Sequence, residues 1–230
     1  LEFRRVLFRS FAKQRVKGIM PRGEFAEVCA QSIRADVLAF KGKIKDYSSP
    51  HSESVDFVVE TAQGNIRLFG YMEPLFGDEN QIIEWRFAKY KDRYRIRPWL
   101  YYLIQLATKE NALPPRIIAK DKDLTLKTIE KSTALEKLKM YVEAYLQSQQ
   151  QIQLIPTENI AKFIEKDESA VNFDNVLTNI ESLAKDDSYG YRKADPYWAR
   201  VLGQTEQFKS KDGLLRLVKQ TTSWFGEMLS

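Results

Sequence analysis

The sequence has one cysteine and one histidine among its 230 residues, and these low counts exclude whole classes of site. A single Cys29 allows no disulfide framework and no zinc site of clustered cysteines and histidines, which favours a reducing compartment. Cys29 and His51 are also the sole thiol and imidazole available for a catalytic dyad. Cys29 falls on an apolar helical stripe and His51 beside Pro50 in a predicted loop. We therefore interpret them as a core thiol and a surface imidazole.

Long apolar runs and phosphate-binding glycine motifs are missing as well. No run approaches the roughly 18 apolar residues of a membrane span, and none of the ten glycines begins a G-x-x-x-x-G-K-[ST] loop. We expect a soluble protein in which nothing suggests ATP binding. The 36 basic and 31 acidic residues give a net charge of +5, which allows nucleic-acid contact through a local patch but does not require it.

The first ten residues, LEFRRVLFRS, fit neither a signal peptide nor a transit peptide. Three arginines interrupt the apolar residues, and acidic residues follow soon afterwards. The segment can be written back as CTG GAG TTC AGA CGT GTG CTC TTC CGA TCT, which looks like a common short-read sequencing adapter. We interpret residues 1–10 as translated adapter, which leaves 33 basic and 30 acidic residues and a net charge of +3. We expect that native sequence before Phe11 is missing and that Ser230 is the natural end.

The first half of the chain predicts the element order α-β-β-β-α-β. Apolar residues three or four apart indicate one long helix within residues 20–47. A helix starting near Pro98 and a short strand within 114–121 complete the order. Between the two helices, alternating or β-branched segments predict strands at 54–61, 65–75 and 81–87.

The second half of the chain indicates helices rather than strands. Apolar residues from Leu135 to Leu146 predict one helix, with Ser132 as its N-cap. Weaker helical patterns lie at 157–166, 173–185, 195–203 and 213–229. We therefore expect an α+β domain, with its core in residues 11–130 and a mainly helical extension of the same domain in residues 131–230.

The αβββαβ order is that of the restriction-endonuclease-like nuclease core. In that core, a carboxylate on the second strand and a (D/E)-x-K motif on the third hold a divalent metal. Here Glu73 in GYMEP falls on the second strand, and Glu84 and Arg86 in IIEWRF fall on the third. Arginine replaces the lysine and cannot exchange a proton near neutral pH. Because Glu84 and Arg86 lie one pleat apart on one face, a simple ion pair between them is the alternative to a metal site.

Four segments resemble a known family in their order and spacing: IMPRGEFAEV, IRLFGYMEPLF, EWRFAKYKDRYRIRPWLYYLIQLA and DPYWARVLGQ. The chain looks like the C-terminal domain of RecC, the gamma subunit of exodeoxyribonuclease V, from about Gly18 to its last residue. The resemblance implies a nuclease fold that has lost its catalytic residues and holds no metal or cofactor, while the partner subunits use ATP and magnesium. It also implies RecB-like and RecD-like partners, contact with double-stranded DNA ends and single-stranded DNA, and a bacterial cytoplasmic location.

Five basic residues occupy successive odd positions beside these motifs: Lys89, Lys91, Arg93, Arg95 and Arg97. On an extended chain they would project to one side about 6.6 Å apart. Such a row could follow a phosphate backbone, and the alternative is a solvated strand edge that discourages aggregation.

Aromatic residues add two further candidates. Trp99, Tyr101 and Tyr102 could stack on bases, but their helical spacing beside leucines is more typical of a core. Tyr197 and Trp198 could contact a partner or pack in a core.

Three functions therefore stay open. The first is a non-catalytic, DNA-contacting and subunit-bridging domain that helps to split the duplex in double-strand-break repair by homologous recombination. The others are an active metal-dependent nuclease and a protein-interaction module with no DNA role.

Overall fold

A computed structural model describes most of the chain, with gaps and a few single positions near the N-terminus. The described stretches are 23–47, 49–109, 111–151, 155–185, 195–204 and 206–229, together with the single residue 153. Residues 1–10, interpreted above as adapter, lie outside the described residues. Contacts divide the chain into two compact units, residues 1–48 and 49–230.

The first unit contains helix α2 (Glu24–Lys43), within the range that the sequence predicts. Its acidic first turn and basic last turn both favour a helix, because they complement the helix dipole. The predicted apolar stripe is buried only in part. Val37 and Phe40 are buried, whereas Phe25 is 65% exposed. Cys29 is only half-buried, so the prediction of a core thiol was wrong.

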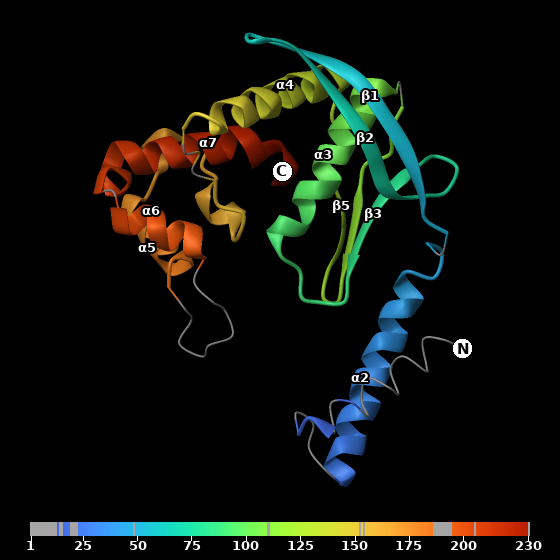
Figure 1. Cartoon of the computed structure of the whole chain (residues 1–230). Coiled ribbons are helices and arrows are strands. Elements are labelled where there is room, and N and C mark those ends of the chain that lie inside the picture. Colours follow the sequence, from blue (N-terminus) through green and yellow to red (C-terminus); the bar gives the residue numbers. More distant parts are fainter. Residues whose placement is uncertain are drawn as a thin grey trace. The chain divides into compact units, whose positions relative to one another are not determined.

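The described part of the second unit is built on a five-stranded mixed sheet in the order β1-β2-β3-β4-β5 (Figure 1). β1 to β3 form an antiparallel meander, β4 pairs parallel with β3, and β5 pairs antiparallel with β4. The strands span His51–Thr61, Gly64–Phe76, Gln81–Arg86, Arg116–Ala119 and Asp123–Thr125. The four predicted strands and the α+β class are confirmed, and the three-residue β5 is an addition.

β1 and β2 form a long hairpin that extends beyond the other strands (Figure 1). They pair from His51 opposite Leu75 as far as Thr61 opposite Gly64. In contrast, β2 pairs with β3 only at Leu75 and Phe76. His51 is exposed, as predicted, but it begins β1 instead of lying in a loop.

The connection from β3 to β4 runs through η1 (Asp92–Arg95) and helix α3 (Ile96–Thr108). Parallel strands need such a crossover, since a tight turn cannot join them. Trp99 and Tyr102 of α3 are fully buried, which confirms their interpretation as core residues.

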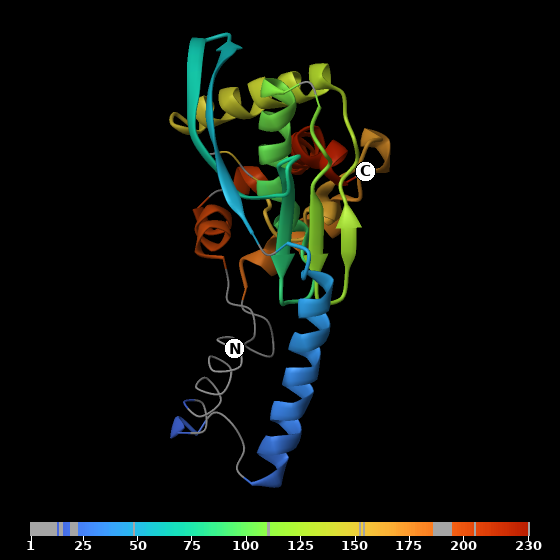
Figure 2. The same cartoon turned by 90° about the vertical axis from the view of Figure 1, so that its right-hand side faces the viewer.

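The C-terminal half is helical, as predicted, and Figure 2 shows α4 crossing one end of α3. Ser132 lies inside α4, whose N-cap is Glu130, so the predicted cap was wrong. The range 157–166 contains only the short η2. The elements are α4 (Lys131–Ser148), η2 (Ile160–Phe163), η3 (Glu168–Ala170), α5 (Phe173–Leu183), α6 (Pro196–Gln204), η4 (Glu206–Lys209) and α7 (Lys211–Leu229).

Two hydrophobic clusters hold the second unit together. The first joins the sheet, α3 and α4 to the end of α7 through Phe225 and Met228. The second joins η2, α5 and α6 to the start of α7 through Leu214 and Leu217. Residues on both sides of position 130 therefore share one core. No helix among the described residues is long and apolar enough to cross a membrane.

Candidate functional site

Glu84 of β3 is a buried carboxylate between two arginines. Its side chain is 4% exposed, and Arg86 Nε donates to Oε1 at 2.7 Å. Arg97, at the start of α3, donates to Oε2. Both arginines are about half exposed, at 53% and 50%. The structure thus contains the predicted pair with Arg86, and it adds Arg97, which the sequence placed in the basic row.

Glu73 lies on β2, as predicted, but its side chain is exposed to solvent. A divalent metal in this kind of core needs two converging carboxylates with oxygens free to coordinate. Both oxygens of Glu84 already accept hydrogen bonds from guanidinium groups. The described residues also contain no group of three or more His, Cys, Asp or Glu side chains placed to hold a metal ion. In this arrangement Glu84 offers no free oxygen to a divalent metal.

The predicted basic row is not extended, which corrects its expected geometry. The Tyr94 N–H donates to the Lys91 carbonyl at 2.9 Å and closes a turn at η1. Arg97 lies in α3. The five side chains therefore leave the backbone in different directions and cannot form one straight row.

The arginines of the row are engaged within the fold. Arg93 pairs with Glu158 at 2.5 Å. Arg95 donates to the Tyr90 hydroxyl and, at 2.8 Å, to the Met228 carbonyl. Burial raises the pKa of Tyr90, while the hydrogen bond from Arg95 opposes that shift, so the phenol stays neutral at neutral pH.

Lys89 and Lys91 are the exposed lysines of the row, and they line a hollow of about 540 Å³. Two lysines of the β4–β5 turn join them. Lys122 Nζ lies 4.5 Å from the centre of the Tyr90 ring, and the Lys120 N–H donates to the Ala88 carbonyl at 2.9 Å. We call Lys89, Lys91, Lys120 and Lys122 the lysine surface.

Asp121 links the β4–β5 turn to the segment that holds Lys89 and Lys91, because its Oδ1 accepts a hydrogen bond from the Tyr90 N–H at 2.7 Å. Sequence reasoning missed Lys120 and Lys122. Their signal, KDKD at the end of a predicted strand segment, is too short to distinguish from an ordinary turn. Only the parallel pairing of β3 with β4 brings this turn beside residues 87–91.

The partner-contact candidates differ in burial. Trp198 is 2% exposed and belongs to the second hydrophobic cluster, so it is a core residue. Tyr197 is 42% exposed and donates its hydroxyl to the Gln153 carbonyl at 2.9 Å. This leaves Tyr197 as the exposed member of the pair.

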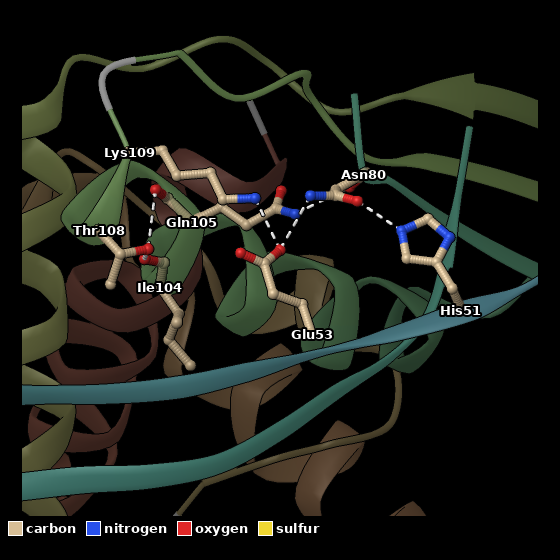
Figure 3. Close-up of polar contacts among 7 residues, drawn as sticks. All are labelled: His51, Glu53, Asn80, Ile104, Gln105, Thr108 and Lys109. Atoms are coloured by element: carbon tan, nitrogen blue, oxygen red, sulfur yellow. Dashed lines mark hydrogen bonds and ion pairs between the residues drawn. The ribbon is translucent and has the colours of Figure 1, made fainter. Parts of the chain in front are cut away.

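A polar network fixes the base of the hairpin (Figure 3). Glu53 of β1 accepts from Lys109 Nζ at 2.6 Å and from Asn80 Nδ2 at 3.1 Å. Asn80 Oδ1 is hydrogen-bonded to His51, and its backbone carbonyl accepts from Gln105 Nε2 at 2.8 Å. These contacts join β1, the β2–β3 turn and the end of α3, which gives His51 a structural partner.

Two comparisons with known proteins agree with one another. The family model described as RecC C-terminal domain matches residues 3–168. The chain is 50% identical over 221 residues to the RecBCD enzyme subunit RecC of Haemophilus influenzae. That alignment covers 94% of this chain and 19% of the relative, so the chain spans less than a fifth of the relative's length.

Proposed function

The chain belongs to the RecC C-terminal domain family, and on this premise we propose that it is a non-catalytic, DNA-contacting and subunit-bridging domain. The parent protein would be a RecC-like subunit of an exodeoxyribonuclease V that acts in double-strand-break repair by homologous recombination. Its proposed partners are RecB-like and RecD-like subunits, which supply ATP and magnesium chemistry. Its proposed substrates are duplex ends, which the subunit helps to split, and single-stranded DNA in the bacterial cytoplasm.

The engagement of Glu84 by two arginines is the observation that supports a non-catalytic domain. The order α2, β1, β2, β3, α3, β4 agrees with a restriction-endonuclease-like core, and Glu84 stands on the strand where such a core holds its metal. A guanidinium stays charged at any physiological pH, and its charge-assisted hydrogen bonds are strong. A divalent ion would have to displace both Arg86 and Arg97 before Glu84 could coordinate it.

The lysine surface supports DNA contact. Lysine ammonium groups are point charges that pair with phosphates and release counterions from nucleic acid. Lys89, Lys91 and Lys122 are exposed, and they gather around Tyr90 from two different segments. A surface of this kind would contact the phosphate backbone and would not distinguish one base sequence from another.

Salt-dependent binding tests the DNA-contacting role in the assembled complex. Changing Lys89, Lys91 and Lys122 to glutamine should weaken binding to all sequences alike. The slope of log K against log salt should shrink by roughly 0.7 to 0.9 for each phosphate that the variant no longer neutralises. A matched control removes the same charge from exposed Lys127, Lys139 and Lys219, and should keep the slope. An unchanged slope in the first variant would favour the protein-interaction module with no DNA role.

DNA degradation by the same complex tests the non-catalytic role. Glu84→Ala, Glu84→Gln and Glu73→Ala should leave the rate near wild type, because neither carboxylate holds a metal. The conservative Glu84→Gln keeps the shape of the buried site, so it separates a loss of chemistry from a loss of folding. If both Glu84→Gln and Glu73→Ala abolish cleavage in a correctly folded complex, an active nuclease replaces this proposal.

A further inference from the structure

Arg86 and Arg97 share one buried carboxylate, that of Glu84. Arg86 Nε and a terminal nitrogen of Arg97 donate to its two oxygens. The two arginines, which we call the arginine pair, come from different elements, the end of β3 and the start of α3. Two positive charges and one negative charge leave this place with a net charge of +1.

The positive charges of this site face solvent, whereas the negative charge does not. Arg86 and Arg97 are 53% and 50% exposed, and Glu84 is 4% exposed. An anion that arrives from solvent therefore meets the guanidinium groups before the carboxylate. Glu84 also fixes both long side chains in the free protein, so a ligand would not have to pay for ordering them.

Each member of the arginine pair keeps most of its donors free. A guanidinium carries five N–H groups in a planar fork, and Glu84 takes one nitrogen from each arginine. Neither arginine makes another hydrogen bond with the residues that the structure describes. Arg67 is the opposite case, because its Nε and Nη2 occupy both oxygens of Asp56 at 2.7 and 2.5 Å. The arginine pair is therefore equipped to bind phosphate oxygens, which fit the guanidinium fork.

The elements around the arginine pair do not cancel its charge. Helix α3 contains no acidic residue. Asp92 of η1 accepts from the Ala161 N–H at 3.3 Å, and Glu73 of β2 forms no ion pair with either arginine in the part of the chain that the structure describes. Lys89 of the lysine surface follows Arg86 by three residues, which span at most about 11 Å. One DNA backbone can therefore contact both sites.

We propose that the arginine pair binds one phosphodiester group of DNA, with Glu84 as the positioning residue that holds both guanidinium groups. Two fixed cations then supply the positive charge that a divalent ion offers to a phosphate in an active nuclease. The contact fixes the position of the backbone and does not distinguish one base from another. The inference rests on the proposed DNA-contacting function and assigns it a second site of different chemistry.

DNA with one neutral methylphosphonate at a time tests this site. The assembled complex is bound to a forked duplex end without ATP, so that the DNA does not move. At one position, the neutral group should weaken wild-type binding by roughly 10- to 150-fold, the range for a lost hydrogen bond to a charged group. In Arg97→Gln the same neutral group should cost almost nothing more, because two changes to one contact are not additive. Arg67→Gln is the matched control and should keep the full effect.

Three further variants separate this contact from charge and from folding. Arg97→Lys keeps the charge but not the fork, so it should keep the salt slope and lose most of the effect at that phosphate. The double variant Glu84→Gln/Arg97→Gln removes one charge of each sign and leaves no unpaired buried carboxylate, and it should behave as Arg97→Gln does. Glu84→Gln alone raises the charge of the site, yet it should weaken the contact, because the arginines lose their fixed positions.

If every methylphosphonate has the same effect in wild type, Arg97→Gln and the double variant, the site is overturned. If the lysine variants nevertheless reduce the salt slope, only this inference fails and the DNA-contacting function stands. Tighter binding of that phosphate by Glu84→Gln would overturn the positioning role. Poor assembly of the complex in Arg97→Lys, with an unchanged effect at every phosphate, also overturns the site and assigns the arginine pair to an acidic partner surface.

Discussion

Tyr141 joins three helices through one hydroxyl group. It lies on α4, donates to the Trp224 carbonyl of α7, and accepts from Trp99 Nε1 of α3 at 3.2 Å. Its ring meets the Trp224 ring edge-on, with 5.9 Å between centroids. Apolar periodicity predicts α4 itself but says nothing of this hydroxyl, because its partners lie on two other helices.

Tyr141→Phe should lower the free energy of unfolding by about 1–3 kcal/mol, because it leaves the Trp99 N–H without its acceptor and removes the hydrogen bond to the Trp224 carbonyl. Tyr145→Phe on the same helix is the matched control. Tyr145 is 65% exposed, so its change should stay within about 0.5 kcal/mol. Denaturant titration of the two variants beside wild type measures both values, and equal losses would contradict the role of this hydroxyl.

The effect of Tyr141→Phe on stability should also depend on pH. Burial raises the pKa of Tyr141 above its usual range, so the unfolded chain ionises before the folded protein does. The stability from this group is therefore complete below about pH 10 and is lost as pH rises beyond that value. The difference in free energy of unfolding between wild type and Tyr141→Phe should therefore become smaller above about pH 10. A difference that stays constant with pH would show that folding does not keep the phenol neutral.

The Glu84 pair shows what a sequence can reveal at the scale of one residue. Arg86 was predictable as a partner because residues two apart on a strand share a face. Arg97 was not, since it follows Glu84 by a turn and the start of a helix, and only the crossover returns it to β3. The prediction of the ion pair was therefore right for the local partner and incomplete for the distant one.

At the scale of elements, the basic row shows how alternation can mislead. Residues 89–97 alternate as a strand does, yet they lead from β3 through η1 into the first residues of α3 and belong to no strand of the sheet. A period of two predicts a strand only where a neighbouring strand can accept its hydrogen bonds. Here a local turn bond from Tyr94 to Lys91 satisfies the backbone instead.

Helix α4 begins without a side-chain cap. Its N-cap residue Glu130 has the extended backbone suited to a cap (φ −77°, ψ 154°) but makes no capping hydrogen bond. Helix α5 shows the alternative, because the Asn172 side chain accepts from the Asn175 N–H at 3.0 Å. The physical difference is the length of the side chain, since short polar residues reach the first free N–H groups.

Glu130→Asp should therefore raise the free energy of unfolding by about 0.5–1 kcal/mol, because the shorter carboxylate can cap α4. Asn172→Ala should lower it by about 1 kcal/mol, because α5 loses an existing cap. Ser132→Ala is the control and should be nearly neutral, since Ser132 lies inside α4 and caps nothing. A large loss with Ser132→Ala, or no gain with Glu130→Asp, would contradict this account of the helix start.

At the scale of the whole molecule, the order of the elements was predictable from the sequence. The packing of C-terminal residues in the same hydrophobic cluster as the sheet was not. The αβββαβ order follows from local periods, which each segment carries in its own residues. The shared cluster depends on Phe225 and Met228 returning to the sheet from the far end of the chain. The adapter interpretation of residues 1–10 stays a prediction, and the family match begins at residue 3, inside that segment.

Helix α7 makes the two hydrophobic clusters dependent on one another. Leu217 is 2% exposed in the second cluster, and Phe225 is 5% exposed in the first. Both lie on one uninterrupted helix of 19 residues. Fraying of one half of α7 therefore removes backbone hydrogen bonds that support the other half, which couples the clusters.

Leu217→Ala should lower the free energy of unfolding by about 2–5 kcal/mol, and Phe225→Ala by about 3–5 kcal/mol, because each leaves a cavity in a packed core. If α7 couples the two clusters, Leu217→Ala should also speed hydrogen exchange in β4. This is the sharper test, because β4 packs in the first cluster and Leu217 lies in the second. Lys219→Ala is the control on the same helix, since Lys219 is half exposed and pairs with Glu168 at 2.8 Å. It should leave exchange in β4 unchanged. If Leu217→Ala speeds exchange only in α5, α6 and the start of α7, the two clusters unfold independently and α7 does not couple them.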